Sequence, residues 1–161
     1  MKHVLEKSNT ISKWGEYPSE RSIEDTLPRS LIIIDKPAGP TSHQVSSWIQ
    51  HMFDMKAGHS GTLDPNVTGV LPMGLGKSVR VIDFLHEISK EYVAAIHFHG
   101  KVDKKEFEDI LEEFSGKIYQ TPPLRSGVKR ERRVREIFDL ELLDFSGRDY
   151  LFRVECESGT Y

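Results

Sequence analysis

The chain has 161 residues, which is enough for one domain with a hydrophobic core and an appended arm. Its formal net charge of −3 excludes a surface that is basic overall, so any nucleic-acid-binding surface must be local. A single cysteine excludes a disulfide framework, and the lack of a long apolar run or signal-peptide pattern leads us to expect a soluble, intracellular protein.

Residues 1–29 are polar and show no periodicity, so we expect an N-terminal extension before a folded domain at residues 30–161. Trp14 and Tyr17 stand among charged residues in this extension. They leave two alternatives open, a flexible tail and an arm that docks on another domain or on a partner.

A strand and a helix are predicted next. The β-branched run at residues 31–34, followed by a proline-rich turn, predicts a buried strand. Thr41 or Ser42 then stands where a helix cap is expected. Apolar residues at helical spacing follow, namely Val45, Trp48, Ile49 and Met52. We therefore expect a helix with Trp48 in the core.

Residues 56–78 form the stretch around which the chain is organised. They include five of the twelve glycines and two of the eight prolines, so we expect a long loop and no regular helix or strand. Loops of this length are usually functional or disordered, and the apolar residues in this one indicate that it packs. At its centre, Pro65 restricts the backbone of Asp64 and holds its carboxylate in a set direction. The stretch therefore predicts a functional loop.

Two more helices and one strand are predicted beyond this loop. Apolar residues between 79 and 88 predict a helix, and residues 92–98 predict a strand. His97 and His99 would share a face of that strand, but no third ligand has matching spacing, so no metal site is predicted. Asp103 and Glu106 form the capping-box pattern of a helix that ends before Gly116. Its expected buried stripe is Phe107, Ile110, Leu111 and Phe114.

Residues 121–135 contain a local basic segment. Between residues 125 and 135, six cations stand against one anion. This arginine-rich cluster favours contact with phosphate over an ordinary solvated loop. Residues 137–145 and 150–155 alternate around a Ser-Gly-Arg-Asp turn and predict a hairpin.

Several chemistries can be tested against the central loop. The tripeptide at residues 76–78 imitates the end of a phosphate-binding loop, but the required upstream glycine is missing. Ser60, His59 and Asp64 could form a nucleophile–base arrangement, although neighbours in one short loop rarely point at one another in this way. Cys156 has no neighbouring histidine to activate it. Two interpretations of Asp64 stay open, a turn or cap residue and a covalent nucleophile.

Six segments, in order, resemble the motifs of the TruB family of RNA pseudouridine synthases. They are DKPAGPTSH at 35–43, GHSGTLDP at 58–65, TGVLP at 68–72, KEY at 90–92, PPLRS at 122–126 and SGTY at 158–161. The arm and the arginine-rich segment are more similar to the archaeal, dyskerin-type branch of H/ACA ribonucleoproteins than to the bacterial tRNA enzyme. The resemblance implies an α+β fold, with a mixed, largely antiparallel sheet flanked by helices and the Asp64 loop in a cleft.

The resemblance also implies residue roles. Asp64 is the nucleophile, Tyr92 stacks on the flipped uracil, and His59 fills in near the vacated stack. Supporting positions are Lys36, Pro37, Gly61 and Thr62. The segment from Thr121 to Arg132 resembles the mobile thumb loop that closes over substrate RNA. RNA contacts are expected for Arg125, Lys129, Arg130, Arg132 and Arg133.

The implied function is the isomerisation of specific uridines to pseudouridine in structured ribosomal or transfer RNA, without a cofactor. The implied partners are an H/ACA guide RNA and small accessory ribonucleoproteins, with no DNA and no membrane. We expect a cytoplasmic location or, in a eukaryote, a nuclear or nucleolar one. The alternative is a non-catalytic RNA-binding or scaffold protein of the same fold.

One departure from the family concerns the end of the sequence. In the family, Gly-Thr-Tyr is followed by an isoleucine and by an arginine that pairs with the catalytic aspartate, whereas this sequence stops at Tyr161. We therefore expect residues 30–161 to be the N-terminal part of a catalytic domain, without its later strands and a C-terminal PUA domain. The activity of the chain by itself is left open.

Overall fold

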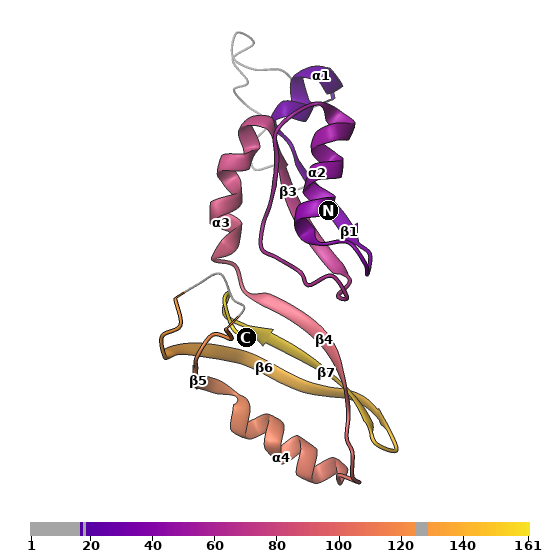
Figure 1. Cartoon of the computed structure of the whole chain (residues 1–161), viewed down its shortest axis with the longest axis vertical. Coiled ribbons are helices and arrows are strands. Elements are labelled where there is room, and N and C mark those ends of the chain that lie inside the picture. The colour runs from indigo at the N-terminus through magenta and orange to yellow at the C-terminus, as the bar shows by residue number, and fades with distance from the viewer. Residues whose placement is uncertain (1–16, 18, 125–128) are drawn as a thin grey trace. The chain divides into compact units, whose positions relative to one another are not determined.

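The computed structural model describes residues 17, 19–124 and 129–161. The chain divides into two compact units, Met1–Ile82 and Asp83–Tyr161. Each unit combines an antiparallel sheet with helices (Figure 1) and has its own hydrophobic cluster. The architecture is therefore the mixed α+β class that the resemblance implied.

The first unit is built on a three-stranded antiparallel sheet. Its strands, in spatial order, are β1 (Leu31–Lys36), β3 (Gly69–Leu75) and β2 (Ala57–His59). The predicted strand at residues 31–34 is thus confirmed, but its exposure alternates along the strand. Ile33 is 65% exposed whereas Lys36 is completely buried, so the prediction that the whole strand is buried is wrong.

The stretch of residues 56–78 is more regular than its composition predicted, because its ends contain β2 and β3. Pro72 lies in the central strand β3, opposite Ile33, and its carbonyl accepts the Ser60 N–H at 2.8 Å. The N–H and C=O of a strand residue point to the same neighbour. The missing N–H of Pro72 therefore faces Ser60, the residue that follows β2, so the pairing of β2 with β3 ends there while the pairing of Pro72 with β1 is left intact.

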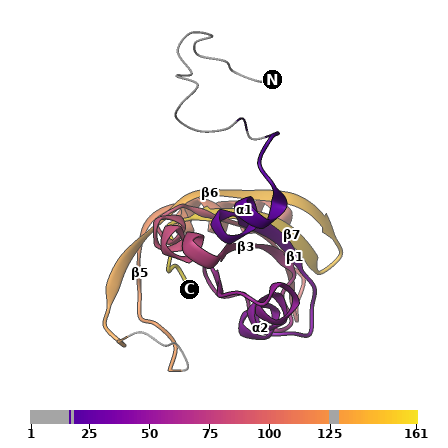
Figure 2. The ribbon, with the colours of Figure 1, turned by 90° about the horizontal axis from the view of Figure 1, so that it is seen from above.

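Helix α2 (Ser42–Phe53) covers one face of this sheet (Figure 2). Thr41 caps it, because Thr41 Oγ1 accepts the Gln44 N–H and the Gln44 side chain accepts the Thr41 N–H. Trp48 is 57% exposed, so its predicted core position is wrong. The buried stripe consists of Ser42, Val45, Ser46 and Ile49. It lies three positions before the predicted one, which rotates the buried face by about 60°.

The end of the expected extension joins the core of the first unit. Two short helices precede β1, namely α1 (Ile23–Thr26) and the 3₁₀ helix η1 (Leu27–Arg29). Leu27 packs against the core, and the Ser30 carbonyl accepts the Leu75 N–H at 3.0 Å. Tyr17 is exposed, and Trp14 lies outside the described residues.

After β3 the chain continues into the 3₁₀ helix η2 (Gly76–Val81) and then α3 (Ile82–His86). A Cβ at Gly74 would lie 2.6 Å from the Ser78 carbonyl oxygen, so glycine is required for this tight exit from β3. The predicted helix at residues 79–88 is thus present in part. Its expected apolar face is not continuous, because Phe84 is exposed.

The second unit is built on a four-stranded antiparallel sheet. In spatial order its strands are β4 (Lys90–His97), β7 (Asp149–Cys156), β6 (Arg133–Ser146) and β5 (Gly116–Gln120). The predicted strand at residues 92–98 and the predicted hairpin are confirmed as β4 and β6–β7. Strand β5, which forms one edge of the sheet, was not predicted from the sequence.

Helix α4 (Lys104–Phe114) packs on one face of the second sheet. Asp103 caps it by accepting the Lys105 N–H at 2.9 Å, so the predicted cap is present. Among the described residues, however, the reciprocal bond of the predicted capping box, from the Asp103 N–H to the Glu106 side chain, is not formed. Phe107 and Leu111 are buried with Tyr150, whereas Ile110 and Phe114 of the expected stripe are exposed. Half of that stripe is therefore buried.

The open face of the second sheet carries a charge cluster around Arg153. Its guanidinium donates to carboxylates on two neighbouring strands, namely Glu91, Asp139 and Glu141. Hydrogen bonds to Glu91 and then Glu141 raise the pKa of Arg153 above its ordinary value. Three acidic side chains around one cation give this face an excess of negative charge.

Candidate active site

Asp64 lies in the loop that joins β2 to β3. Its side chain is exposed, and within the described part of the chain its carboxylate makes no hydrogen bond or ion pair. The turn after it is closed by backbone atoms, because the Val67 N–H donates to the Asp64 carbonyl oxygen at 3.1 Å. The carboxylate is therefore not used to cap a turn, which was one of the two interpretations left open by the sequence.

Lys36 holds the backbone of this loop from a completely buried position at the end of β1. Its Nζ donates to carbonyl oxygens of Pro37, Asp64, Pro65 and Val67, at 3.0, 3.1, 3.3 and 2.8 Å. A buried ammonium group is unfavourable unless its N–H groups have acceptors. The lysine and the four carbonyls consequently fix one another, and the backbone after Asp64 is held in one place.

Ser42 holds the residue that precedes Asp64. The Oγ of this buried serine accepts the Leu63 N–H at 2.9 Å and donates to the Leu63 carbonyl oxygen at 3.1 Å. The Gly39 N–H also donates to the Pro65 carbonyl oxygen at 2.7 Å. Together with Lys36, these contacts fix the chain on both sides of Asp64 while its side chain stays accessible.

His59 and Gly61 organise the beginning of the loop. His59 Nδ1 lies 2.5 Å from the Gly61 carbonyl oxygen, which can only accept, so Nδ1 carries the hydrogen. The His59 ring also packs edge-on against His43, with 5.0 Å between ring centroids. Gly61 has a φ of +83°, and nothing lies within 4 Å of the place of a Cβ. The backbone angle, not a lack of space, therefore favours glycine there; Thr62 beside it is exposed.

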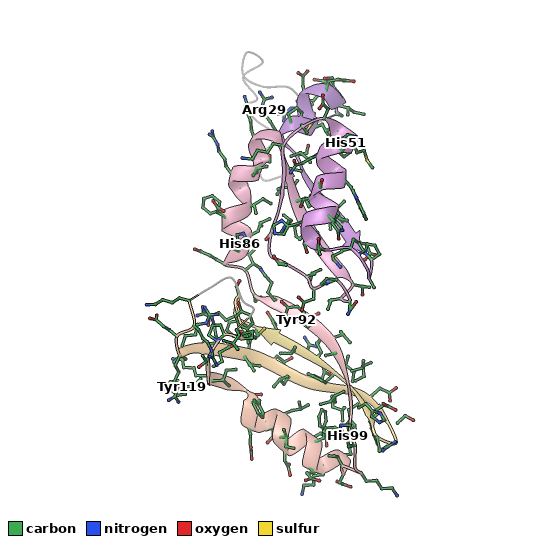
Figure 3. The ribbon with its side chains drawn as sticks, viewed as in Figure 1. Arg29, His51, His86, Tyr92, His99 and Tyr119 are labelled. Atoms are coloured by element: carbon green, nitrogen blue, oxygen red, sulfur yellow. The ribbon has the colours of Figure 1, made fainter. Side chains whose placement is uncertain are left out.

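Tyr92, the predicted stacking residue, lies on β4 of the second unit, opposite Val154 of β7 (Figure 3). Burial, and to a smaller extent the neighbouring Cys156, raises the pKa of the Tyr92 phenol above its ordinary value. The ring is 41% exposed. It lines an apolar hollow of about 530 Å³, together with Phe114 and Ile137 among others. The phenol is therefore neutral at physiological pH and offers part of its surface to a ligand.

The predicted RNA-contact residues lie between β5 and the start of β6. Arg125 is outside the described residues; Lys129, Arg130, Arg132 and Arg133 are within them. Lys129 pairs with Glu131, which is the one anion of this segment. The guanidinium carbon of Arg132 lies 4.4 Å from the centre of the Tyr119 ring.

Two groups of the predicted residues can be distinguished. Six lie around one loop of the first unit, namely Lys36, Pro37, His59, Gly61, Thr62 and Asp64. Tyr92 and the basic residues belong to the second unit. Ser42 and Tyr119 were not predicted as site residues. Ser42 could have been found from its position at the start of a predicted helix. Nothing in the sequence distinguishes Tyr119 from an ordinary strand residue.

The described residues contain no group of three or more histidine, cysteine, aspartate or glutamate side chains that could hold a metal ion. His97, one of the two histidines considered for metal binding, places Nδ1 2.6 Å from Asp149 Oδ1 on the neighbouring strand. In the described part of the chain, no helix is long and apolar enough to span a bilayer.

Comparison with known protein families gives two matches along the chain. Residues 50–161 match the family described as TruB family pseudouridylate synthase (N terminal domain). Residues 2–46 match the DKCLD (NUC011) domain.

Among individual proteins, the chain is 48% identical over 159 residues to a "Probable tRNA pseudouridine synthase B" of Methanocaldococcus jannaschii, covering 98% of this chain and 47% of that protein. It is likewise 48% identical over 158 residues to a protein of the same description from Methanothermobacter thermautotrophicus, covering 98% and 49%. The chain thus spans about half the length of the curated relatives it matches.

Two solved structures are similar to the chain. One, described as "Crystal Structure of a Cbf5-Nop10-Gar1 Complex", has a TM-score of 0.89 at 48% identity, over 97% of this chain and 48% of that chain. The other, described as "Structure of H/ACA RNP bound to a substrate RNA containing 2'-deoxyuridine", has a TM-score of 0.84 at 44% identity, over 97% and 46%.

Proposed function

Because the chain belongs to the TruB family of pseudouridylate synthases, we propose that the complete protein isomerises specific uridines of structured RNA to pseudouridine. The observation that carries the proposal is the environment of Asp64. Its carboxylate is exposed, while buried Lys36 and Ser42 hold the backbone on either side. This arrangement suits a covalent nucleophile, because the rate of attack depends strongly on where the carboxylate is held.

The reaction moves atoms without changing the composition of the nucleotide. The bond between ribose carbon 1′ and base nitrogen 1 breaks, the base turns, and carbon 5 joins carbon 1′. Carbon 5 loses a proton and nitrogen 1 gains one, so the product is an isomer and no redox or energy-carrying cofactor takes part. Asp64 attacks either ribose carbon 1′ or base carbon 6, and both routes begin with a uridine that has left its stack.

Tyr92 is proposed to stack on the uracil. A phenol face that is partly exposed gives a pyrimidine a surface on which to stack. The raised pKa keeps the hydroxyl protonated, so it can donate a hydrogen bond to the base. Accepting the carbon-5 proton would require the phenol to lose its own proton first, which favours an orienting role for Tyr92 over that of a standing base.

The basic segment is proposed to contact RNA phosphates through Lys129, Arg130, Arg132 and Arg133, as well as Arg125. The solved relatives are described in a Cbf5-Nop10-Gar1 complex and in an H/ACA RNP with a substrate RNA. On this basis we propose an H/ACA-type guide RNA and small accessory proteins as partners of the complete protein. The acidic face around Arg153 would repel phosphates, so it is not a candidate for this RNA surface.

The proposal is tested with the complete protein assembled with guide RNA and accessory proteins, by following tritium release from carbon-5-labelled uridine in the target RNA. Asp64→Asn should abolish release and leave RNA binding unchanged. Asp54→Asn is the matched control, because Asp54 is exposed and has a φ of 48°, a conformation that asparagine adopts readily. Release by Asp64→Asn at the control's rate would overturn the nucleophile. The absence of release from the unaltered protein with every guide would support the scaffold alternative.

A further inference from the structure

We propose that Tyr119 and Arg132 form a stacking site for an unpaired nucleotide of the bound RNA, at the base of the basic segment. The inference rests on the proposed function, because it specifies how the RNA of that function is held. It concerns a base-stacking contact and not the phosphate contacts already proposed for the arginines.

Tyr119 is placed where an aromatic ring contributes little to the hydrophobic core. It is the second-to-last residue of the edge strand β5 and lies opposite Val134 of β6 (Figure 3). Its side chain is 69% exposed, whereas Tyr150 of the same sheet is buried beneath α4. An exposed tyrosine beside a cluster of cations is typical of surfaces on which single-stranded bases stack.

Arg132 contacts the Tyr119 ring, and we call these two groups together the stacking platform. Its guanidinium carbon lies 4.4 Å from the ring centroid, within the range of a cation–π contact. In the part of the chain that the structure describes, no carboxylate pairs with Arg132, because the neighbouring Glu131 is engaged by Lys129. Arg132 is exposed, and arginine planes stack on RNA bases.

The surroundings offer both space and charge for a nucleotide. A hollow of about 350 Å³ is lined by Tyr119, Arg132, Arg133 and Val134, a size within the range of small-ligand sites. Arg133 is held beside it, with its guanidinium 5.3 Å from the Tyr161 ring centroid and a donated hydrogen bond to the Gly159 carbonyl oxygen at 3.4 Å. A base on Arg132 would thus have a second, oriented cation near its phosphate.

The excess of positive charge in this segment indicates which class of ligand binds here. From residue 129 to residue 135, five cations stand against one anion. A polyanion is therefore favoured over an acidic peptide, whose extended backbone would leave the stacking platform unused. An unpaired nucleotide can stack its base on Tyr119 and Arg132 and place its phosphate beside the cations.

The experiment separates stacking from simple charge attraction. In the complete protein assembled with guide RNA and accessory proteins, RNA affinity is measured across a range of salt concentrations for Tyr119→Leu and Arg132→Lys. Phe145→Leu is the matched control, because Phe145 is a half-exposed ring with Lys104 5.8 Å away, at the other end of β6. 4-Thiouridine in either the substrate or the guide strand is used to cross-link the RNA and to identify which strand supplies the base.

We expect Tyr119→Leu to weaken binding by about 5- to 100-fold with an unchanged salt slope, since a stacked base and no charge is lost. Arg132→Lys should also weaken binding, because it keeps the charge but loses the planar group. The cross-links should map to Tyr119 or Arg132, and Phe145→Leu should bind normally.

Wild-type affinity for both Tyr119→Leu and Arg132→Lys would overturn the stacking site and leave a phosphate contact in its place. That failure is distinguishable from failure of the proposed function, because tritium release at saturating RNA depends on Asp64. A Tyr119→Leu protein that binds normally and releases tritium refutes only the stacking site.

Discussion

Replacing Lys36 with methionine should loosen the Asp64 loop without touching the Asp64 carboxylate. Methionine has a similar length but cannot donate to the carbonyl oxygens that Lys36 now satisfies, including those of Asp64, Pro65 and Val67. These groups would then have to find water or move. We expect the loop to move, because the site of Lys36 is completely buried.

The magnitude follows from the contacts. Lys36 Nζ has three N–H groups and lies 2.8–3.3 Å from four carbonyl oxygens, and such bonds to a charged group contribute about 1.5–3 kcal/mol each. The desolvation of the lysine offsets much of this stabilisation. We therefore expect a loss of about 3–5 kcal/mol in the free energy of unfolding, because several buried carbonyl groups are left without a donor at about 1–3 kcal/mol each. A shift of about 1 Å in Asp64 would lower the single-turnover rate roughly 100-fold.

The assay combines denaturant unfolding with single-turnover tritium release at saturating RNA. Lys77→Met is the matched control, since Lys77 is exposed in the same unit, and it should change neither quantity. If Lys36→Met unfolds at the wild-type denaturant concentration and reacts at the wild-type rate, the lysine does not hold the loop, and the reasoning about the fixed backbone is refuted.

Three further changes test neighbouring parts of the account. Ser42→Ala should lower the free energy of unfolding by about 1–3 kcal/mol and slow the single-turnover reaction, because both backbone groups of Leu63 lose their partner. Ser47→Ala is the control; Ser47 is exposed, so this change should alter neither measurement. Gly61→Ala should destabilise the fold by about 1–2 kcal/mol, because alanine is strained at the Gly61 φ of +83°. Gly100→Ala is the control, because a Cβ there also meets no atoms within 4 Å and the position has no such φ. Equal unfolding midpoints for the two variants would contradict the backbone argument. Burial disfavours the Tyr92 phenolate, so the difference between the ultraviolet titrations of wild type and Tyr92→Phe should have its midpoint above pH 10. The contribution of this shift to the free energy of unfolding should decline as the pH rises above 10, because the unfolded tyrosine ionises there first. A midpoint at or below pH 10 would show that Tyr92 is not shielded in this way.

Much of the fold was accessible from the sequence where local chemistry and packing agree. The Thr41 cap and the Asp103 cap are set by side chains that reach backbone groups in their own helix, so sequence spacing suffices to find them. The hairpin of β6 and β7 was found for the same reason, because its turn and its alternation are local.

The errors arose where tertiary packing decides. Glycine and proline content suggested an irregular stretch, yet β3 forms the centre of a sheet. The missing N–H of Pro72 faces Ser60 at the end of β2 and so leaves the pairing of β3 with β1 intact. Periodicity located α2 but not the rotation of its buried face, so Trp48 was misplaced. A pattern within one segment does not contain the shape of the surface that the segment packs against.

In the candidate site, too, local features could be predicted from the sequence whereas tertiary contacts could not. The Asp64 loop could be identified from its composition and from family resemblance, and Lys36 was given a supporting role. That Lys36 is buried among carbonyls, and that Ser42 binds both backbone groups of Leu63, depends on contacts between residues more than twenty positions apart. Likewise, the pairing of Tyr119 with Arg132 follows from the alignment of β5 with β6 and has no local sequence signal.

The central claim is that a fixed backbone places one carboxylate where it must be for the reaction, and Asp64→Glu tests it most directly. The added methylene keeps the charge and extends the carboxylate by about 1.5 Å. Measured by single-turnover tritium release at saturating RNA, the account predicts a loss of at least about 100-fold with unchanged RNA affinity. A rate within a few-fold of wild type would contradict the claim, because it would mean that the position set by Lys36 and Ser42 does not matter.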